Sequence, residues 1–465
     1  MKRFTIPALA LCAFVASLGH AQGQVEKKNM ELVGYNDLQG RSAYQPLVQK
    51  QGERWIAYVG HHGGKTVNAV TGQPEDNGTS IIDVTDPHAP RYLAHIPGEP
   101  GEGESGGAQM VRTCSGDQLP KGEKGRTYLL RTFGNQAHEI YDVTQPEKPV
   151  LVTTVVKGLK GTHKNWWECD SGIAYLVSGT EGWKVRRMTQ VWDLSDPKNP
   201  RFIRHFGLPG QQPGSPGEAP MELHGMISTG PQGNRIYFGY GTNKSGVMQI
   251  VDRKKLLEGA PEVNDANLQA PEVGRLTLPP TNGAHTTFPL LGVDVAEFAR
   301  DKVGAKRDFA VIVDESLVNE CQEARQMVWI ADITAEAKPF NVASWTVPEA
   351  SGNFCSRGGR FGSHSSHENF TSIYYKRLMF IAFFNAGLRA LDVRDPYHPR
   401  EVGYFIPATT DKTDKRCVGE RCKVAIQTNN VDVDDRGYVY IVDRANTGMH
   451  ILEPTGEAAA IANRR

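Results

Sequence analysis

An acidic turn recurs along this chain and constrains its fold more than any other feature. In each copy an apolar, β-branched run ends in an acid, and the four clear copies continue into a Pro-x-x-Pro turn. Proline fixes φ at about −65° and removes an amide donor, so each copy predicts a tight turn after a strand. The clear copies lie at residues 82–91, 141–149, 192–200 and 391–400, and weaker ones at residues 251–253, 331–334 and 452–454. The anchoring acids are Asp83, Asp142, Asp193, Asp252, Asp332, Asp392 and Glu453.

A second alternating run follows each clear turn, at residues 91–96, 150–155, 201–206 and 401–406. Period-two patterning bounded by proline and glycine is the signal of two strands joined by a turn. Repeats of about 40–60 residues that contain several strands are typical of a propeller rather than a sandwich. The seven anchoring acids therefore predict an all-β fold, a seven-bladed β-propeller.

The two ends of the chain complement each other. Residues 29–38 have the pattern of an outer strand without its blade, because Val33-Gly34-Tyr35 matches Val402-Gly403-Tyr404 after the sixth acid. The sequence meanwhile ends shortly after Glu453, with no strand behind that acid. We expect the N-terminal strand to complete the last blade and close the ring, which removes strand edges that invite aggregation.

The acid-and-proline turn resembles the repeat of the LVIVD-repeat family, which comprises secreted and surface proteins with β-propeller folds. The resemblance extends over nearly all of residues 22–465. It implies the architecture of the protein and not its chemistry.

The first 21 residues have the pattern of a secretory signal peptide. Met1-Lys2-Arg3 is a basic head, residues 4–18 are apolar, and Gly19 and Ala21 are small residues that suit cleavage. We expect residues 22–465 to form a single domain that is periplasmic or secreted. No later segment approaches the ~20 apolar residues that a membrane span needs. The balance of 52 basic and 52 acidic residues argues against a nucleic-acid partner.

Six of the seven cysteines follow the predicted cleavage site. An even number of cysteines in an oxidising compartment favours disulfide bonds. We favour the pairs Cys114–Cys169, Cys321–Cys355 and Cys417–Cys422, although spacing alone leaves other pairings open.

Four histidines hold similar places in successive repeats. His163, His224 and His367 stand ten to twelve residues before the second strand of their repeats, and His285 opens the fifth unit. The innermost strands of a propeller line its channel, so we expect these imidazoles to converge at one rim and bind a transition metal ion, Fe, Cu or Zn. The alternative is that repeat symmetry copies a polar residue that only binds channel water or a neighbouring blade.

Further polar residues are expected at the same rim, because most of them follow the second strand of a repeat. The candidate catalytic residues are His364, Glu181, Arg131, Arg444 and Tyr240. Carboxylates, arginines and imidazoles together suit the binding of an anionic small molecule and the transfer of protons. Nearby tryptophans leave an aromatic substrate open. A solvated loop face is the competing interpretation for any one of these residues.

The function that these patterns favour is a metal-dependent enzyme, an oxidoreductase or lyase, that acts on a small molecule at the channel mouth. The histidine set is similar in arrangement to that of carotenoid-cleaving oxygenases, whose propeller holds iron with four histidines. The architecture also resembles the selenium-binding protein and methanethiol oxidase family, which has copper. Both resemblances are at the level of the fold. The alternatives are a non-catalytic periplasmic or surface module that binds a protein or glycan, and a metal-independent lyase or hydrolase.

Overall fold

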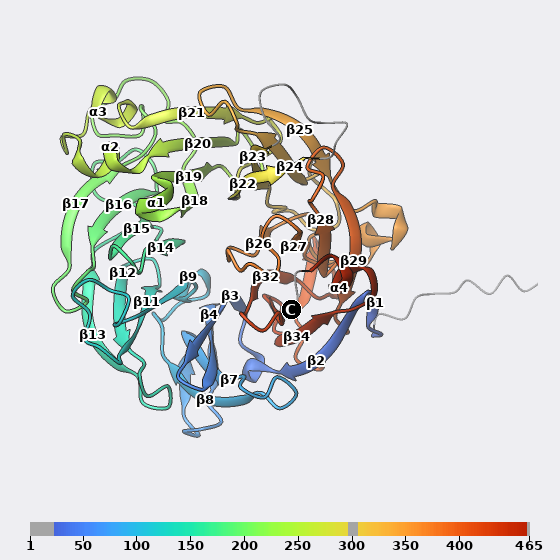
Figure 1. Ribbon diagram of the computed structural model, residues 1–465. Coiled ribbons are helices and arrows are strands. Elements are labelled where there is room, and N and C mark those ends of the chain that lie inside the picture. Colours follow the sequence, from blue (N-terminus) through green and yellow to red (C-terminus); the bar gives the residue numbers. More distant parts are fainter. Residues whose placement is uncertain (1–22, 296–305, 463–465) are drawn as a thin grey trace, which may run out of the picture.

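Seven sheets radiate from a common centre in the computed structural model, which describes residues 23–295 and 306–462 (Figure 1). Each sheet contains four antiparallel strands that follow one another from the centre outwards, and two sheets carry a fifth strand. The seven-bladed β-propeller predicted from the repeats is therefore confirmed. The signal peptide predicted for residues 1–21 lies outside the described residues.

The strands form four concentric rings. The innermost strands are β3 (Ala43–Gln51), β10 (Val111–Ser115), β14 (Asn165–Trp167), β18 (Leu223–Ser228), β22 (Thr286–Asp294), β26 (Ser365–Ser366) and β32 (Thr428–Val433). The second ring contains β4 (Arg54–Gly63), β11 (Thr127–Phe133), β15 (Ile173–Ser178), β19 (Arg235–Tyr240), β23 (Lys306–Val313), β27 (Leu378–Ala382) and β33 (Val439–Asp443). The third contains β7 (Thr79–Asp83), β12 (Ala137–Asp142), β16 (Met188–Asp193), β20 (Val247–Asp252), β24 (Val328–Asp332), β28 (Leu388–Asp392) and β34 (Met449–Pro454). The outermost contains β8 (Arg91–Ile96), β13 (Val150–Val156), β17 (Arg201–Phe206), β21 (Glu272–Thr277), β25 (Phe340–Trp345), β29 (Arg400–Ile406) and β2 (Met30–Asn36).

The remaining elements decorate this frame. Additional strands are β1 (Glu26–Lys28) beside β29, β9 (Gly103–Ala108) beside β4, and the pairs β5 (Lys65–Val67) with β6 (Pro74–Asp76) and β30 (Lys415–Val418) with β31 (Arg421–Val424). The short helices are α1 (Gly230–Gly233), α2 (Arg253–Glu258), α3 (Asp265–Gln269) and α4 (Gly456–Ile461), and the 3-10 turns are η1 (Leu38–Gly40), η3 (Glu349–Ser351) and η4 (Phe354–Ser356). Among the described residues, the helices are all too short to cross a membrane.

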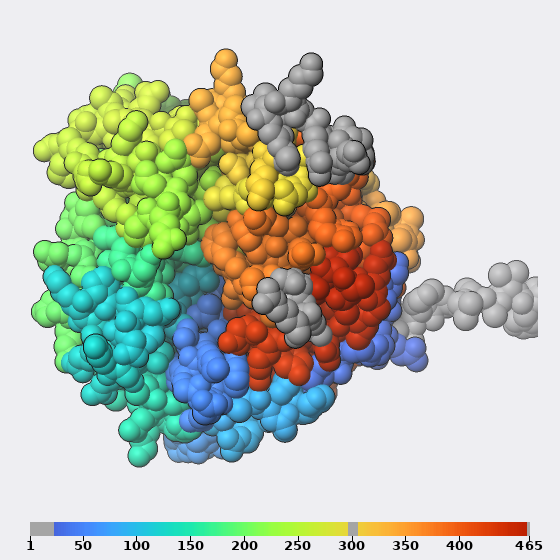
Figure 2. All heavy atoms as spheres, viewed as in Figure 1, coloured from blue at the N-terminus to red at the C-terminus, as the bar shows by residue number. Residues whose placement is uncertain are grey.

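The N-terminal strand closes the ring as expected. Strand β2 pairs antiparallel with β34, with Met30 opposite Pro454 and Asn36 opposite Met449. Figure 2 shows the consequence, because the first and last segments of the chain, blue and red, lie side by side. The last blade is thus built from both ends of the chain.

The repeated acid has a local structural role that explains why the pattern predicts the fold. At the end of β7, the carboxylate of Asp83 accepts a hydrogen bond of 3.0 Å from the backbone N–H of Thr85. It also forms an ion pair of 2.8 Å with Arg91. Four more of the repeated aspartates accept a hydrogen bond from the backbone N–H of the residue two positions later, namely Asp142, Asp193, Asp332 and Asp392. This is the side-chain turn by which aspartate holds a chain reversal in place.

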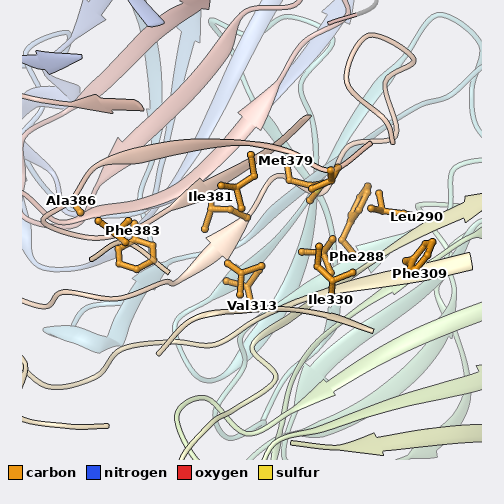
Figure 3. Close-up of a cluster of buried hydrophobic side chains, with 14 of the residues drawn as sticks. Phe288, Leu290, Phe309, Val313, Ile330, Met379, Ile381, Phe383 and Ala386 are labelled. Carbon is orange, nitrogen blue, oxygen red and sulfur yellow. The ribbon is translucent and has the colours of Figure 1, made fainter. Parts of the chain in front are cut away.

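Apolar side chains from adjacent sheets pack between the blades. Figure 3 shows one such cluster, in which β22 and β23 of the fifth blade face β27 of the sixth. Burial of this kind contributes roughly 25 cal/mol per Å² of apolar surface and holds neighbouring blades together. The labelled side chains are Phe288, Leu290, Phe309, Val313, Ile330, Met379, Ile381, Phe383 and Ala386.

All three predicted disulfide bonds are confirmed. Cys114 of β10 joins Cys169 and so links the second blade to the third. Cys321 joins Cys355, and Cys417 joins Cys422 across the hairpin of β30 and β31.

Gly34 of the last blade packs against the turn at Pro87 of the first blade, and this contact, called the seam below, predicts how a substitution of Gly34 changes stability. A Cβ atom at Gly34 would lie 1.9 Å from the backbone oxygen of Pro87, in the first acidic turn. We expect Gly34→Ala to lower the free energy of unfolding by about 1–3 kcal/mol, because strand or turn must move to relieve the overlap. Urea denaturation measures the change.

The matched control is Gly23→Ala, where a Cβ meets no atom within 4 Å. This control should leave stability unchanged within about 0.5 kcal/mol. Equal stability of Gly34→Ala and the wild-type protein would contradict a tightly packed seam.

Candidate metal centre

Four imidazoles meet where the innermost strands of four blades begin. His163 lies two residues before β14, His224 is the second residue of β18, and His285 and His364 directly precede β22 and β26. Each of these histidines exposes at most 3% of its surface. Successive blades turn about one axis, so equivalent positions at the start of their innermost strands face a common point. The four residues are called the His cluster below.

The rings of the His cluster are in contact. The Nε2 atoms of His163 and His224 are 2.8 Å apart, and these two rings are nearly perpendicular. The ring centres of His224 and His285 are 3.6 Å apart, and those of His285 and His364 are 4.4 Å apart. The structure thus brings three of the four predicted metal ligands together with His364.

Backbone carbonyl groups fix the tautomers of two of these rings. The Nδ1 atom of His224 lies 3.0 Å from the carbonyl oxygen of His285, and that of His364 lies 2.6 Å from the carbonyl oxygen of Asn429. A carbonyl oxygen only accepts hydrogen bonds, so each Nδ1 carries the proton. In the neutral rings Nε2 therefore carries the lone pair, and this atom lies 2.8 Å from Nε2 of His163 in the case of His224 and 3.6 Å from Glu315 in the case of His364.

Glu315 supplies a carboxylate to the same centre. Its oxygens lie 3.9 Å from Nε2 of His285 and 3.6 Å from Nε2 of His364. One donor atom from each of His224, His285 and Glu315 lies within 4.8 Å of the other two, a grouping that could hold a metal ion. The Nε2 atom of His285 is buried and has no hydrogen-bond partner.

Burial determines the charge state of the cluster. Removal from water lowers the pKa of each of the four imidazoles well below its usual value, and neighbouring cationic groups lower it further. The rings are therefore neutral at neutral pH, which is the form that binds metal ions. Burial raises the pKa of Glu315, against the opposing charge of Arg360.

Tyr44, which the sequence analysis did not single out, lies beside the cluster. Its Oη atom is 2.9 Å from Nε2 of His163, and its ring meets the rings of His62 and His364 edge-on. Burial, together with the charge of Glu315, raises the pKa of Tyr44 well above its usual value, so the phenol stays protonated. Tyr44 is the second residue of β3, the innermost strand of the first blade, as His224 is of β18 in the fourth.

His367 lies outside the cluster, contrary to the place that the repeat spacing gave it. Its ring packs against Phe288 and Phe380, with centre-to-centre distances of 5.6 and 5.7 Å. Its Nδ1 atom accepts a hydrogen bond of 3.2 Å from the backbone N–H of Phe380. His364 occupies the place in the cluster that was predicted for His367. Its backbone N–H donates a hydrogen bond to the carbonyl oxygen of Ala382, the last residue of β27.

Three of the predicted catalytic residues lie elsewhere. Arg131 is buried against Glu139, with an ion pair of 2.9 Å. The hydroxyl of Tyr240 donates a hydrogen bond of 3.0 Å to Gln249, within an apolar cluster of the third and fourth blades. Glu181 is an exposed residue of a turn.

Arg444, another of the five candidates, belongs to a group of charged and polar residues near the His cluster, and in addition to burial its charge helps to lower the pKa of His364. Its guanidinium is 3.1 Å from Glu104, whose carboxylate also lies 3.4 Å from Nε2 of His62 and 3.9 Å from Arg187. Arg360 joins this group through an ion pair of 3.2 Å with Glu315. Together Arg187, Arg360, Arg444, Glu104 and His62 are called the mouth.

A second group of buried charged residues lies next to the His cluster and consists of Lys164, Glu368 and Arg112. Lys164 follows His163 and is buried with an ion pair to Glu368, and its Nζ atom donates a hydrogen bond of 3.1 Å to Thr286. Glu368 also pairs with Arg112. These charges are satisfied among themselves, and the positive charge of Lys164 helps to keep the imidazoles above it neutral.

Comparisons with known proteins support the fold. No model of a known protein family matches the chain, and no curated protein matches it in sequence. Among solved structures, the C-terminal WD40 domain of Sif2 is similar, with a TM-score of 0.50 and 8% sequence identity, covering 92% of this chain and 99% of that one. The β-propeller domain of Cps50 (Swd1) from Myceliophteria thermophila has a TM-score of 0.49 and 8% identity, covering 89% and 97%. At such identity the likeness to Sif2 shows the propeller fold alone, and the resemblance to the LVIVD-repeat family stays a prediction.

Because His367 is buried among apolar side chains, we predict how it makes the free energy of unfolding depend on pH. Burial lowers the pKa of this residue to about 4, against about 6.5 for an unfolded histidine. As pH falls through that interval, the unfolded chain binds a proton that folded His367 does not, so stability is lost at about 1.4 kcal/mol per pH unit. In His367→Asn, which keeps an acceptor for Phe380, the free energy of unfolding should fall with pH less steeply by that slope.

Urea denaturation of metal-free protein between pH 7 and pH 4.5 makes the measurement. His88→Asn, at an exposed turn position, serves as the control and should follow the wild-type curve. Parallel curves for His367→Asn and the wild-type protein would contradict the lowered pKa of His367.

Proposed function

We propose that a transition-metal ion binds in the His cluster, held by His224, His285, His364 and Glu315, with His163 within reach. The observation that carries the proposal is the inward direction of the Nε2 lone pairs of His224 and His364, fixed by the carbonyl groups behind them. Hydrogen bonds to the distal imidazole nitrogen are the usual means by which proteins orient metal ligands.

The distances to Glu315 support an ion at this point. Its oxygens are 3.6 and 3.9 Å from the Nε2 atoms of His364 and His285, which is too long for hydrogen bonds. Ligand atoms bound to one ion at about 2.0–2.2 Å are separated by distances of this size. An ion would also give the buried Nε2 atom of His285 the partner that it lacks.

The donor chemistry narrows the choice of metal. Imidazole and carboxylate without thiolate suit Fe(II), Cu or Zn. The six cysteines within the described residues are all joined in disulfide bonds, so none supplies a thiolate. The hard cations Mg²⁺ and Ca²⁺ prefer sites made of oxygen atoms and fit this cluster poorly.

The same site is proposed to act on a small molecule, as a metal-dependent oxidoreductase or lyase. A bound ion would supply Lewis-acid or redox chemistry there. Tyr44 is protonated, and its hydroxyl lies 2.9 Å from His163, so this residue can donate a proton at the edge of the cluster. The charged mouth near the cluster is the side from which a polar substrate would enter.

Export of the protein belongs to the same proposal. Three disulfide bonds are compatible with an oxidising compartment. The basic and apolar pattern of residues 1–21 supports passage to the periplasm or beyond.

Metal content tests the proposal directly. Protein purified from the periplasm without an affinity tag should contain close to one Fe, Cu or Zn per chain by elemental analysis. His224→Ala and His364→Ala should lose most of this metal, because each removes an inward lone pair. His367→Ala should retain it, because that ring packs against Phe288 and Phe380.

Two controls make the outcome decisive. His88→Ala removes an exposed imidazole and should retain the metal, and circular dichroism should show the same fold for every variant. Wild-type protein that stays metal-free after loading with each ion, or full metal occupancy in His224→Ala, would refute the metal centre.

A further inference from the structure

Glu104 has the most exposed side chain of the mouth, and residues from three blades contact its carboxylate. His62 comes from the first blade, Arg187 from the third and Arg444 from the seventh. The side chain of Glu104 is 46% exposed, whereas those of Arg187 and Arg444 are 7% and 12% exposed. A carboxylate that solvent reaches is therefore bound by cations that solvent hardly reaches.

The backbone of Glu104 is held independently of its carboxylate. Its carbonyl oxygen accepts a hydrogen bond of 2.9 Å from the side chain of Asn135 and one of 3.4 Å from that of Gln109. Strand β9 also pairs with β4 on both sides of Glu104, where Gly107 and Gly103 face His62 and Gly63. The carboxylate can therefore leave the mouth by rotation of the side chain while the strand stays in place.

We propose that Glu104 is an internal substitute for the carboxylate of the substrate. In this proposal Arg187, Arg360 and Arg444 form an anion subsite, and a carboxylate-bearing small molecule enters by displacing the side chain of Glu104. The inference rests on the proposed function, because it places the substrate of that same centre.

The charge balance of the mouth favours a carboxylate. Three guanidinium groups, of Arg187, Arg360 and Arg444, surround the carboxylates of Glu104 and Glu315. When Glu104 moves away, Arg444 loses its acidic partner, and a cation this deeply placed is costly to leave unpaired. Arginine binds carboxylates through paired N–H donors, so a ligand carboxylate restores what Glu104 supplied.

A ligand bound in this way would reach the His cluster. The Nε2 atom of His62 lies 3.4 Å from the carboxylate of Glu104, and the ring centre of His62 lies 5.3 Å from that of Tyr44, which contacts His163. A molecule whose carboxylate replaces that of Glu104 would therefore lie beside Tyr44 and the imidazoles. The subsite would thus orient the substrate against the proposed metal ion.

Binding of benzoate to metal-free protein tests the subsite. Titration calorimetry at low salt should show that Glu104→Ala binds benzoate at least about tenfold more tightly than the wild-type protein, because the competing carboxylate is gone. Glu104→Gln, which keeps the side-chain size and removes the charge, should also bind more tightly. Addition of Arg444→Gln to Glu104→Ala should reverse the gain.

Two matched variants serve as controls. Glu102→Ala removes an exposed carboxylate two residues away, and Arg421→Gln removes an exposed arginine outside the mouth, so neither should change the affinity for benzoate. Equal affinities of Glu104→Ala and the wild-type protein would overturn the proposal. Unchanged affinity after addition of Arg444→Gln would do the same.

The titration keeps the subsite and the metal centre separate. Because the protein is metal-free, benzoate binding reports only on the mouth, while elemental analysis of untreated protein reports only on the His cluster. Protein that shows the expected benzoate affinities but no metal would remove the metal centre and keep the anion subsite. The opposite result would remove the subsite and leave the metal centre intact.

Discussion

The antiparallel pairing of β2 with β34 joins the two ends of the chain, and the candidate site depends on this pairing. The cluster and its mouth draw residues from the first, third, fourth, fifth, sixth and seventh blades. These residues converge only if every sheet keeps its angle to the common axis, and an open ring leaves the angles between the last and first blades undetermined. Arg444 and His62 belong to the two blades that the seam joins, so the mouth is set by ring closure itself.

The interior of the ring shows how a propeller accommodates polar groups that a hydrophobic core would not tolerate. The space between neighbouring blades is apolar, as in the cluster around Phe288 and Met379. The central axis instead carries neutral imidazoles and, beneath them, the charges of Lys164, Arg112 and Glu368, which are paired with one another. Stability therefore comes from the packing between blades, which leaves the axis available for chemistry.

The fold could be predicted from the sequence because its signal is local. An aspartate that accepts the backbone N–H two residues on makes the same turn wherever it occurs, and the proline nearby marks it. Three of the site histidines follow the same logic, since His163, His224 and His285 are spaced by 61 residues each. In the sixth blade the innermost strand has only two residues, and a turn at residues 372–377 separates it from β27. Counting back from β27 therefore selected His367 instead of His364.

Other members of the site could not be found from the repeat, for physical reasons. Glu104 lies on β9, a strand that pairs with β4 outside the four-strand pattern of the repeat. Strand alternation decides which face of a sheet a side chain occupies, and the repeat alone did not show that Arg131 and Tyr240 pack within the blades. Glu315 follows β23 in the same blade as His285, and its role depends on its distances to His285 and to His364 of the sixth blade.

The depth of the His cluster has a consequence for the order of events in the life of the protein. Its imidazoles come from four blades and are almost fully buried, so a nascent or partly folded chain presents them singly and too far apart to chelate an ion. An ion held there would be acquired only at the end of maturation, in whichever compartment the ring is completed. Occupancy would then record where the chain folded and which metals were available in that place.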